Sequence, residues 1–286
     1  YLVEREVQKL LSHRLKNAAL YHVWDHPVFS GVHSVPMRIF KPAGVPKSAL
    51  LLFFHGGGWV TGTIDSYDGV CADMATATGC TVAAVDYRLA PEHRFPAAPE
   101  DCYAAAREVF RSAGSFGVEQ ENVVLIGDSA GGNLAAAVSL MARDRREFRP
   151  HRQILIYPAL DSDHSENSPY PSVRENGTGY LLTAKRVRDY MALYRSSESD
   201  LTNPYFAPLQ APSLAGQPET LLITAEYCPL RDEGEAYGKR LREEGMRVEI
   251  HRIPDALHGY FSLPARFSQV KQTYEIINCF LEKAHE

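Results

Sequence analysis

The sequence lacks any apolar run long enough to span a membrane, and it has no block of basic residues. Its formal net charge of −5 gives no reason to expect a nucleic acid or an anionic membrane surface as a partner. The 5 cysteines are odd in number and widely spaced, without a Cys-x-x-Cys pair, and so indicate neither a disulfide framework nor a zinc site. Scattered free thiols are typical of a reducing compartment, so we expect a cytoplasmic protein. The chain starts at Tyr1 rather than at methionine, which leaves earlier removal of a signal peptide open.

The pattern of apolar residues predicts one large α/β domain, alone or with a small cap. The chain has 286 residues, of which 45% are hydrophobic, enough for a sizeable core. Short apolar runs alternate with segments of helical periodicity, which predicts a mostly parallel sheet with helices on both faces. Strands are expected at 49–54, 81–86, 123–126, 153–157, 220–224 and 247–251, and helices near 1–20, 99–111, 133–141, 183–194, 232–244 and 268–283. An edge strand is expected at 32–40, because Pro36 argues against a central position.

A Gly-Asp-Ser-Ala-Gly pentapeptide at 127–131 stands between a predicted strand and a predicted helix. This context is that of a nucleophile elbow, in which a tight turn lifts a serine hydroxyl above the sheet. The N-terminal N–H groups of the following helix then point to the place where negative charge develops. The sequence therefore predicts Ser129 as a nucleophile.

A second motif, His-Gly-Gly-Gly-Trp at 55–59, follows the predicted strand at 49–54. Three successive glycines allow backbone N–H groups to approach a ligand closely, as in the oxyanion hole of lipases and esterases. We expect the donors to be the N–H groups of Gly56, Gly57 and Ala130. Trp59 is expected to form a wall of the substrate pocket.

Of the eleven histidines, only His258 stands in the loop directly after the last predicted strand. On hydrolases with a nucleophile elbow, the general base comes in this place, after the serine and the acid. His258 is therefore the predicted base for Ser129.

In these motifs the chain resembles the hormone-sensitive-lipase-like family of bacterial esterases. The matching segments are His55-Gly-Gly-Gly-Trp59, Asp86-Tyr-Arg-Leu-Ala-Pro-Glu92, Gly127-Asp-Ser-Ala-Gly-Gly-Asn133, Asn203-Pro-Tyr205 and His258-Gly-Tyr260. The resemblance implies an α/β-hydrolase fold with an eight-stranded, mainly parallel sheet and a helical cap. We expect that cap at about 1–25 and about 161–203, with Tyr180 in the substrate pocket beside Trp59. It also implies hydrolysis of short-chain carboxylic esters through an acyl-enzyme, without a metal or other cofactor.

The chain departs from the family at position 228, where the triad aspartate is replaced by Cys228. A thiol with an ordinary pKa of about 8.5 is mostly protonated at neutral pH and stabilises an imidazolium poorly. Glu226, Asp232 and Asp255 are nearby carboxylates that could orient His258 instead, and Asp232 and Glu226 are the leading candidates. The sequence does not choose among them.

The function expected from these residues is that of a serine carboxylesterase acting on a small ester. Two alternatives stay open: a small-molecule binding protein on a degenerate hydrolase fold, which Cys228 alone favours, and an acyltransferase. No nucleic acid and no stable membrane insertion are expected, and a homodimer is left open.

Overall fold

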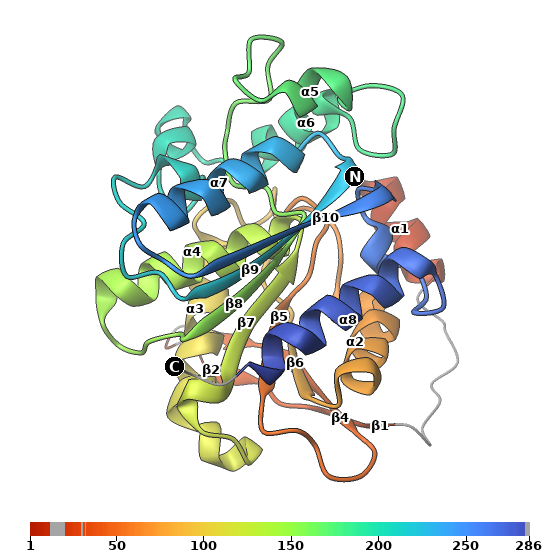
Figure 1. Cartoon of the computed structure of the whole chain (residues 1–286), viewed down its shortest axis with the longest axis vertical. Helices are drawn as coiled ribbons and strands as arrows, with labels where there is room; N and C mark the ends of the chain where they lie inside the picture. The colour runs from red at the N-terminus through yellow and green to blue at the C-terminus, as the bar shows by residue number, and fades with distance from the viewer. Residues whose placement is uncertain (12–20, 30, 32, 284–286) are drawn as a thin grey trace.

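An eight-stranded sheet forms the centre of the computed structural model, which describes residues 1–11, 21–29, 31 and 33–283 (Figure 1). In spatial order its strands are β1 (Tyr21–Asp25), β4 (Met37–Pro42), β6 (Thr81–Val85), β5 (Leu50–Phe54), β7 (Val123–Asp128), β8 (Arg152–Ile156), β9 (Glu219–Tyr227) and β10 (Val248–Leu257). β4 runs antiparallel to both of its neighbours, and the pairs from β6 to β10 are parallel. The predicted α/β fold with a mostly parallel sheet is confirmed.

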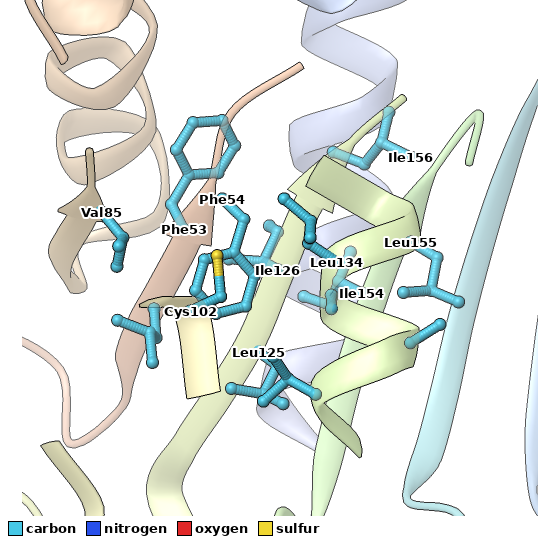
Figure 2. Packing of buried hydrophobic residues seen from close by; sticks show 14 of the residues in the cluster. Phe53, Phe54, Val85, Cys102, Leu125, Ile126, Leu134, Ile154, Leu155 and Ile156 are labelled. Atoms are coloured by element: carbon cyan, nitrogen blue, oxygen red, sulfur yellow. The ribbon is translucent and has the colours of Figure 1, made fainter. Parts of the chain in front are cut away.

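The middle strands are buried along their whole length, which explains why their sequences are largely apolar. Every residue of β5, β6, β7 and β8 is buried, as expected for parallel strands covered on both faces. Figure 2 shows Leu134 of α4 (Ala130–Arg145) and Cys102 of α3 (Ala97–Arg111) within the same apolar packing as Leu125 and Ile126 of β7.

Helices cover both faces of the sheet (Figure 1). α2 (Ile64–Thr78) and α8 (Ser268–Glu282) lie together on one face, and α3 and α4 lie together on the other. α7 (Arg231–Glu243) packs against β9 and β10. Because the parallel strands point the same way, the loops after β5, β7, β9 and β10 gather at one edge of the sheet.

Three further helices, α1 (Leu2–Leu11), α5 (Pro171–Glu175) and α6 (Ala184–Tyr194), together with the segment 176–183 that joins α5 to α6, are here called the cap. α5 and α6 lie beyond the end of the sheet where the chain leaves β7 (Figure 1). The side chain of Thr183 accepts a hydrogen bond from the N–H of Arg186, which confirms the predicted start of α6. α1 is tied to the main domain by Arg5, which donates to the carbonyls of Val60 (2.8 Å) and Ala90 (2.9 Å).

Several predicted boundaries are wrong. Residues 21–25 form β1 and pair with β4 in the main sheet, so this part of the expected cap belongs to the sheet edge. The segment at 32–40, expected to be one edge strand, contains β3 (Ser34–Val35) and the start of β4, with Pro36 between them. β3 pairs with β2 (Val28–Phe29). β4 is not an edge strand, because β1 pairs with its outer side. β10 continues to Leu257, beyond the expected end at His251. Residues 12–20 of the expected first helix, and Val32, lie outside the described residues.

Candidate active site

The turn between β7 and α4 holds Ser129 in a backbone conformation that few residues other than glycine adopt. Its φ is 56° and its ψ is −117°, a sparsely populated region that costs about 1–3 kcal/mol and is typical of functional sites. Both flanking glycines are required, because a Cβ at Gly127 would overlap the carbonyl of Gly131, and one at Gly131 would overlap the carbonyl of Phe54. The turn thus packs directly against the end of β5.

His258 follows β10 and meets Ser129 across the end of the sheet. Its Nε2 lies 2.9 Å from Ser129 Oγ, a hydrogen-bond distance suited to proton transfer. The imidazole is partly exposed to the cavity described below and packs near the ring of Tyr157, with 4.7 Å between the centroids. Desolvation lowers the pKa of His258 to about 3, so the ring is neutral at pH 7 and able to accept a proton.

Cys228 occupies the other side of the imidazole. Its Sγ lies 3.1 Å from His258 Nδ1 and accepts the N–H of Leu230 at 3.4 Å. The side chain is fully buried, and this burial raises the pKa of the thiol well above its usual value. The partner of Nδ1 is therefore an uncharged thiol at neutral pH.

The two leading carboxylate candidates, Asp232 and Glu226, are engaged elsewhere. Asp232 accepts from Arg231 Nε and from the N–H of Ser172, both at 2.7 Å. Glu226 accepts the N–H of Asp255 at 2.7 Å. These carboxylates bind other donors, and Nδ1 meets Sγ of Cys228, so the structure does not support the prediction that Asp232 or Glu226 orients His258.

The N–H groups of the glycine loop after β5 that could bind an oxyanion differ from the predicted set by one residue. The N–H of Gly56 donates to Asp128 Oδ1 at 2.8 Å, so this donor is occupied. Gly57 and Gly58, with positive φ angles of 117° and 61°, line the cavity above Ser129 together with Ala130. The donors available to an oxyanion are thus those of Gly57, Gly58 and Ala130, and Gly56 is removed from the predicted set.

A cavity of about 290 Å³ lies above these groups, between the sheet and the cap. Trp59 lines it, whereas Tyr180 does not, because its ring stacks on Tyr227 with 5.3 Å between the centroids. The cap residues that line the cavity are Leu181, Leu182, Arg186, Val187 and Tyr190. Sequence reasoning missed them, although the helical spacing of Arg186 and Tyr190 in the predicted cap was a usable signal.

Comparison with known proteins also indicates an α/β-hydrolase fold. A family model described as alpha/beta hydrolase fold matches residues 51–262. An arylesterase of Saccharolobus solfataricus is 35% identical over 269 residues, which cover 94% of this chain and 86% of that protein. The chain belongs to the hormone-sensitive-lipase-like esterases of the α/β-hydrolase superfamily.

Two further relatives support the placement in this esterase family. An ethyl acetate hydrolase of Pseudomonas putida is 34% identical over 235 residues, covering 81% of this chain and 73% of that protein. The solved structure of a hyperthermophilic esterase from the archaeon Pyrobaculum calidifontis superposes with a TM-score of 0.90 at 35% identity. That match covers 98% of this chain and 92% of the solved one.

Two features, a metal-binding cluster and a membrane-spanning helix, are not found in the described part of this esterase. Among the described residues, no group of three or more His, Cys, Asp or Glu side chains is placed to hold a metal ion. No described helix has both the length and the apolarity needed to cross a bilayer.

Asp128 carries a buried carboxyl next to Ser129. Sequence reasoning did not single it out, although it lies within the pentapeptide. Besides the N–H of Gly56, it accepts the hydroxyls of Tyr67 (3.2 Å) and Tyr157 (3.3 Å). Burial nevertheless raises its pKa to about 6. The carboxyl therefore joins the glycine loop to the elbow, although burial of its negative charge costs free energy.

We expect the substitution Asp128→Asn to change how stability depends on pH. The folded pKa of Asp128 lies about two units above its unfolded value, so its contribution to the free energy of unfolding is largest below pH 4. That contribution is lost as pH rises to about 6, and amounts to about 3 kcal/mol. Asparagine keeps an acceptor for Gly56 and does not ionise. The stability of Asp128→Asn relative to the wild type should thus rise by about this amount between pH 4 and 7.

Urea unfolding at four pH values between 4 and 7 measures this difference. Glu121→Gln, at an exposed position, serves as the control and should follow the wild type. Parallel curves for Asp128→Asn and the wild type would contradict the raised pKa.

Proposed function

We propose that this chain is a serine carboxylesterase that hydrolyses short-chain carboxylic esters through an acyl-enzyme on Ser129. The observation that carries the proposal is the 2.9 Å contact between Ser129 Oγ and His258 Nε2 at the floor of the cavity. Its support also includes the glycine loop beside the elbow, and relatives whose names describe hydrolysis of aryl esters and ethyl acetate.

In the first half of the reaction, Ser129 Oγ attacks the ester carbonyl while His258 Nε2 takes the serine proton. The negative charge that develops on the carbonyl oxygen is met by the N–H groups of Gly57, Gly58 and Ala130, the last of these at the N-terminus of α4. The imidazolium then returns the proton to the leaving alcohol as the carbon–oxygen bond of the ester breaks. Water repeats the sequence on the acyl-enzyme, releases the acid and restores Ser129.

Cys228 contributes packing rather than charge in this account. A carboxylate only accepts hydrogen bonds and so fixes the proton of a neutral imidazole on Nδ1, whereas a thiol can donate or accept. The neutral Sγ of Cys228 therefore neither selects the tautomer that leaves Nε2 free nor stabilises the imidazolium. His258 then works as a weakly supported base, and the enzyme turns over more slowly than one with an aspartate at position 228.

Replacement of Ser129 by alanine should abolish ester hydrolysis and labelling by a fluorophosphonate probe, because Ser129 Oγ is the hydroxyl that lies 2.9 Å from His258 Nε2. Hydrolysis of p-nitrophenyl butyrate and in-gel labelling measure both effects. Ser199→Ala, in the short segment after α6, is the matched control and should behave as the wild type. Labelling that persists in Ser129→Ala would show that Ser129 is not the nucleophile. A wild-type protein that does not hydrolyse the ester would favour the alternative of a small-molecule binding protein.

Acyl chains of two to about six carbons should be preferred over longer ones, because the cavity of about 290 Å³ is bounded by the cap. The measurement is kcat/KM for p-nitrophenyl esters of graded chain length, from acetate to laurate. Faster turnover of the twelve-carbon ester than of the four-carbon ester would rule the preference out.

The substitution Cys228→Asp should raise kcat by about tenfold or more, by analogy with the roughly 10⁴-fold loss when a serine protease loses the charge of its triad aspartate. A carboxylate at this position also raises the pKa of His258, so the acidic limb of the kcat/KM profile should move to higher pH. In the wild type that limb should lie well below pH 5, because desolvation holds the pKa of His258 near 3.

Two alanine variants accompany this measurement. Cys228→Ala should change kcat/KM by less than about tenfold, and Cys102→Ala, at a buried thiol in the core, reports the effect of a cavity alone. If Cys228→Ala is as damaging as His258→Ala, the thiol is a working member of the triad and the account of Cys228 is wrong.

A further inference from the structure

A leucine of the cap marks the place where the cavity above Ser129 opens to solvent. Leu181, in the segment that joins α5 to α6, lines the cavity and is nevertheless 71% exposed. A side chain that belongs to the cavity wall and also faces water stands at the mouth of the cavity. A single exposed leucine is ordinary on a protein surface, whereas a contiguous exposed apolar group is typical of a binding surface.

Leu181 is one member of such a contiguous group. Its chain neighbour Tyr180, 36% exposed, stacks on Tyr227 with 5.3 Å between the ring centroids. Tyr227 ends β9 and is the register partner of Leu257, the last residue of β10, which is 41% exposed. These four residues, Tyr180, Leu181, Tyr227 and Leu257, are here called the apolar rim.

The apolar rim borders the loop that carries the proposed base. Leu257 immediately precedes His258, and Leu181 Cδ2 stands 4.0 Å from the place of a Cβ on Gly259, the residue after His258. During acylation the imidazolium gives its proton to the leaving oxygen, so the alcohol half of the ester has to lie beside His258 Nε2. The acyl half stays bonded to Ser129 at the floor of the cavity. The two halves of the ester therefore meet different surroundings.

We propose that the apolar rim binds the alcohol half of the ester, and that Leu181 determines a preference for esters of apolar arylalkyl alcohols. This inference rests on the proposed function, because it needs the leaving oxygen to lie beside His258. The cavity of about 290 Å³ is bounded by the cap and limits the length of the acyl chain. The rim, by contrast, is open to solvent and sets no such limit on the size of the alcohol.

The charges next to the rim argue against an anionic alcohol half. Glu226 precedes Tyr227 in β9, and Asp255 lies two residues before Leu257 in β10. The negative charges of these two carboxylates raise the pKa of Tyr227, so they act at the rim itself. An uncharged apolar alcohol therefore suits this surface better than an alcohol that carries a carboxylate or a phosphate.

The test uses pairs of esters that differ in one half only. Ethyl acetate and 2-phenylethyl acetate share the acyl group and release alcohols of similar acidity, so the ratio of their kcat/KM values, the alcohol ratio, reports contacts of the alcohol half. Ethyl butyrate and ethyl acetate share the alcohol, so their ratio, the acyl ratio, reports contacts of the acyl half. Release of acid is followed in a pH-stat for the wild type, Leu181→Ser, Leu181→Met and Val45→Ser. Val45, 97% exposed in the loop before β5, is the matched control.

The wild type should show an alcohol ratio of about ten or more in favour of 2-phenylethyl acetate. Leu181→Ser removes the apolar contact and should lower the alcohol ratio by about fivefold or more, with the acyl ratio changed by less than about twofold. Leu181→Met keeps an apolar side chain of similar volume and should hold the alcohol ratio within about twofold of the wild type. Val45→Ser should match the wild type in both ratios. A thermal melt checks that each variant is folded.

The inference is overturned if the wild type shows no preference for the arylalkyl ester, or if Leu181→Ser leaves the alcohol ratio unchanged. It is also overturned if Leu181→Ser changes the acyl ratio instead, since Leu181 then borders the acyl half. Unchanged ratios together with later elution of Leu181→Ser in size-exclusion chromatography would assign the rim to a contact between copies of the chain. Failure of the proposed function looks different: the wild type would release acid from none of the three esters, or Ser129→Ala would keep its activity.

Discussion

The close approach of the elbow to the end of β5 is the constraint on which the rest of the site depends. Gly131 lies so near the carbonyl of Phe54 that no side chain fits between them. This contact brings the nucleophile turn and the glycine loop to the same edge of the sheet, and Asp128 fastens them through the N–H of Gly56. Because β5 and β7 are adjacent parallel strands, the sheet itself sets the distance between Ser129 and the proposed oxyanion donors.

Burial has opposite consequences for the two groups that flank the imidazole of His258. It raises the pKa of Cys228 and so removes the charge that a triad acid normally supplies, and it lowers the pKa of His258 itself. The same fold that forms the proposed oxyanion hole thus leaves the proposed base neutral at pH 7. If the proposed function holds, reactivity depends more heavily on the backbone donors, and hence on whatever holds the glycine loop in place.

The sequence predicts the sheet, the elbow and the histidine because each has a local signal. Continuous apolar runs mark buried parallel strands, glycines at fixed spacing mark the turn around Ser129, and His258 stands at a defined point after the last strand. The family resemblance places Cys228 at the position of the triad acid, and its Sγ lies 3.1 Å from His258 Nδ1. The expectation that Asp232 or Glu226 takes the acid's place is not met. Whether Asp232 faces the imidazole or Arg231 depends on three-dimensional contacts that linear spacing does not contain.

Other features depended on long-range contacts in the same way. The N–H of Gly56 is taken by Asp128, 72 residues away, which shifts the available donors by one residue. Tyr180 and Tyr190 belong to the same predicted cap, yet only Tyr190 reaches the cavity, because the ring of Tyr180 stacks on Tyr227. The strand at Tyr21–Asp25 was assigned to the cap because its partner, β4, is not adjacent in sequence.

The most direct test of the account is the protonation of His258, followed by ¹H–¹⁵N NMR of histidine-labelled protein between pH 3 and 8. The His258→Gln variant identifies its signal among the eleven histidines. A neutral ring held beside an uncharged thiol should stay unprotonated far below its usual value, with a pKa near 3. A pKa at or above the ordinary value of about 6.5 would contradict the account, because the ring would then be solvated or would stand beside a negative charge, from a thiolate or a carboxylate.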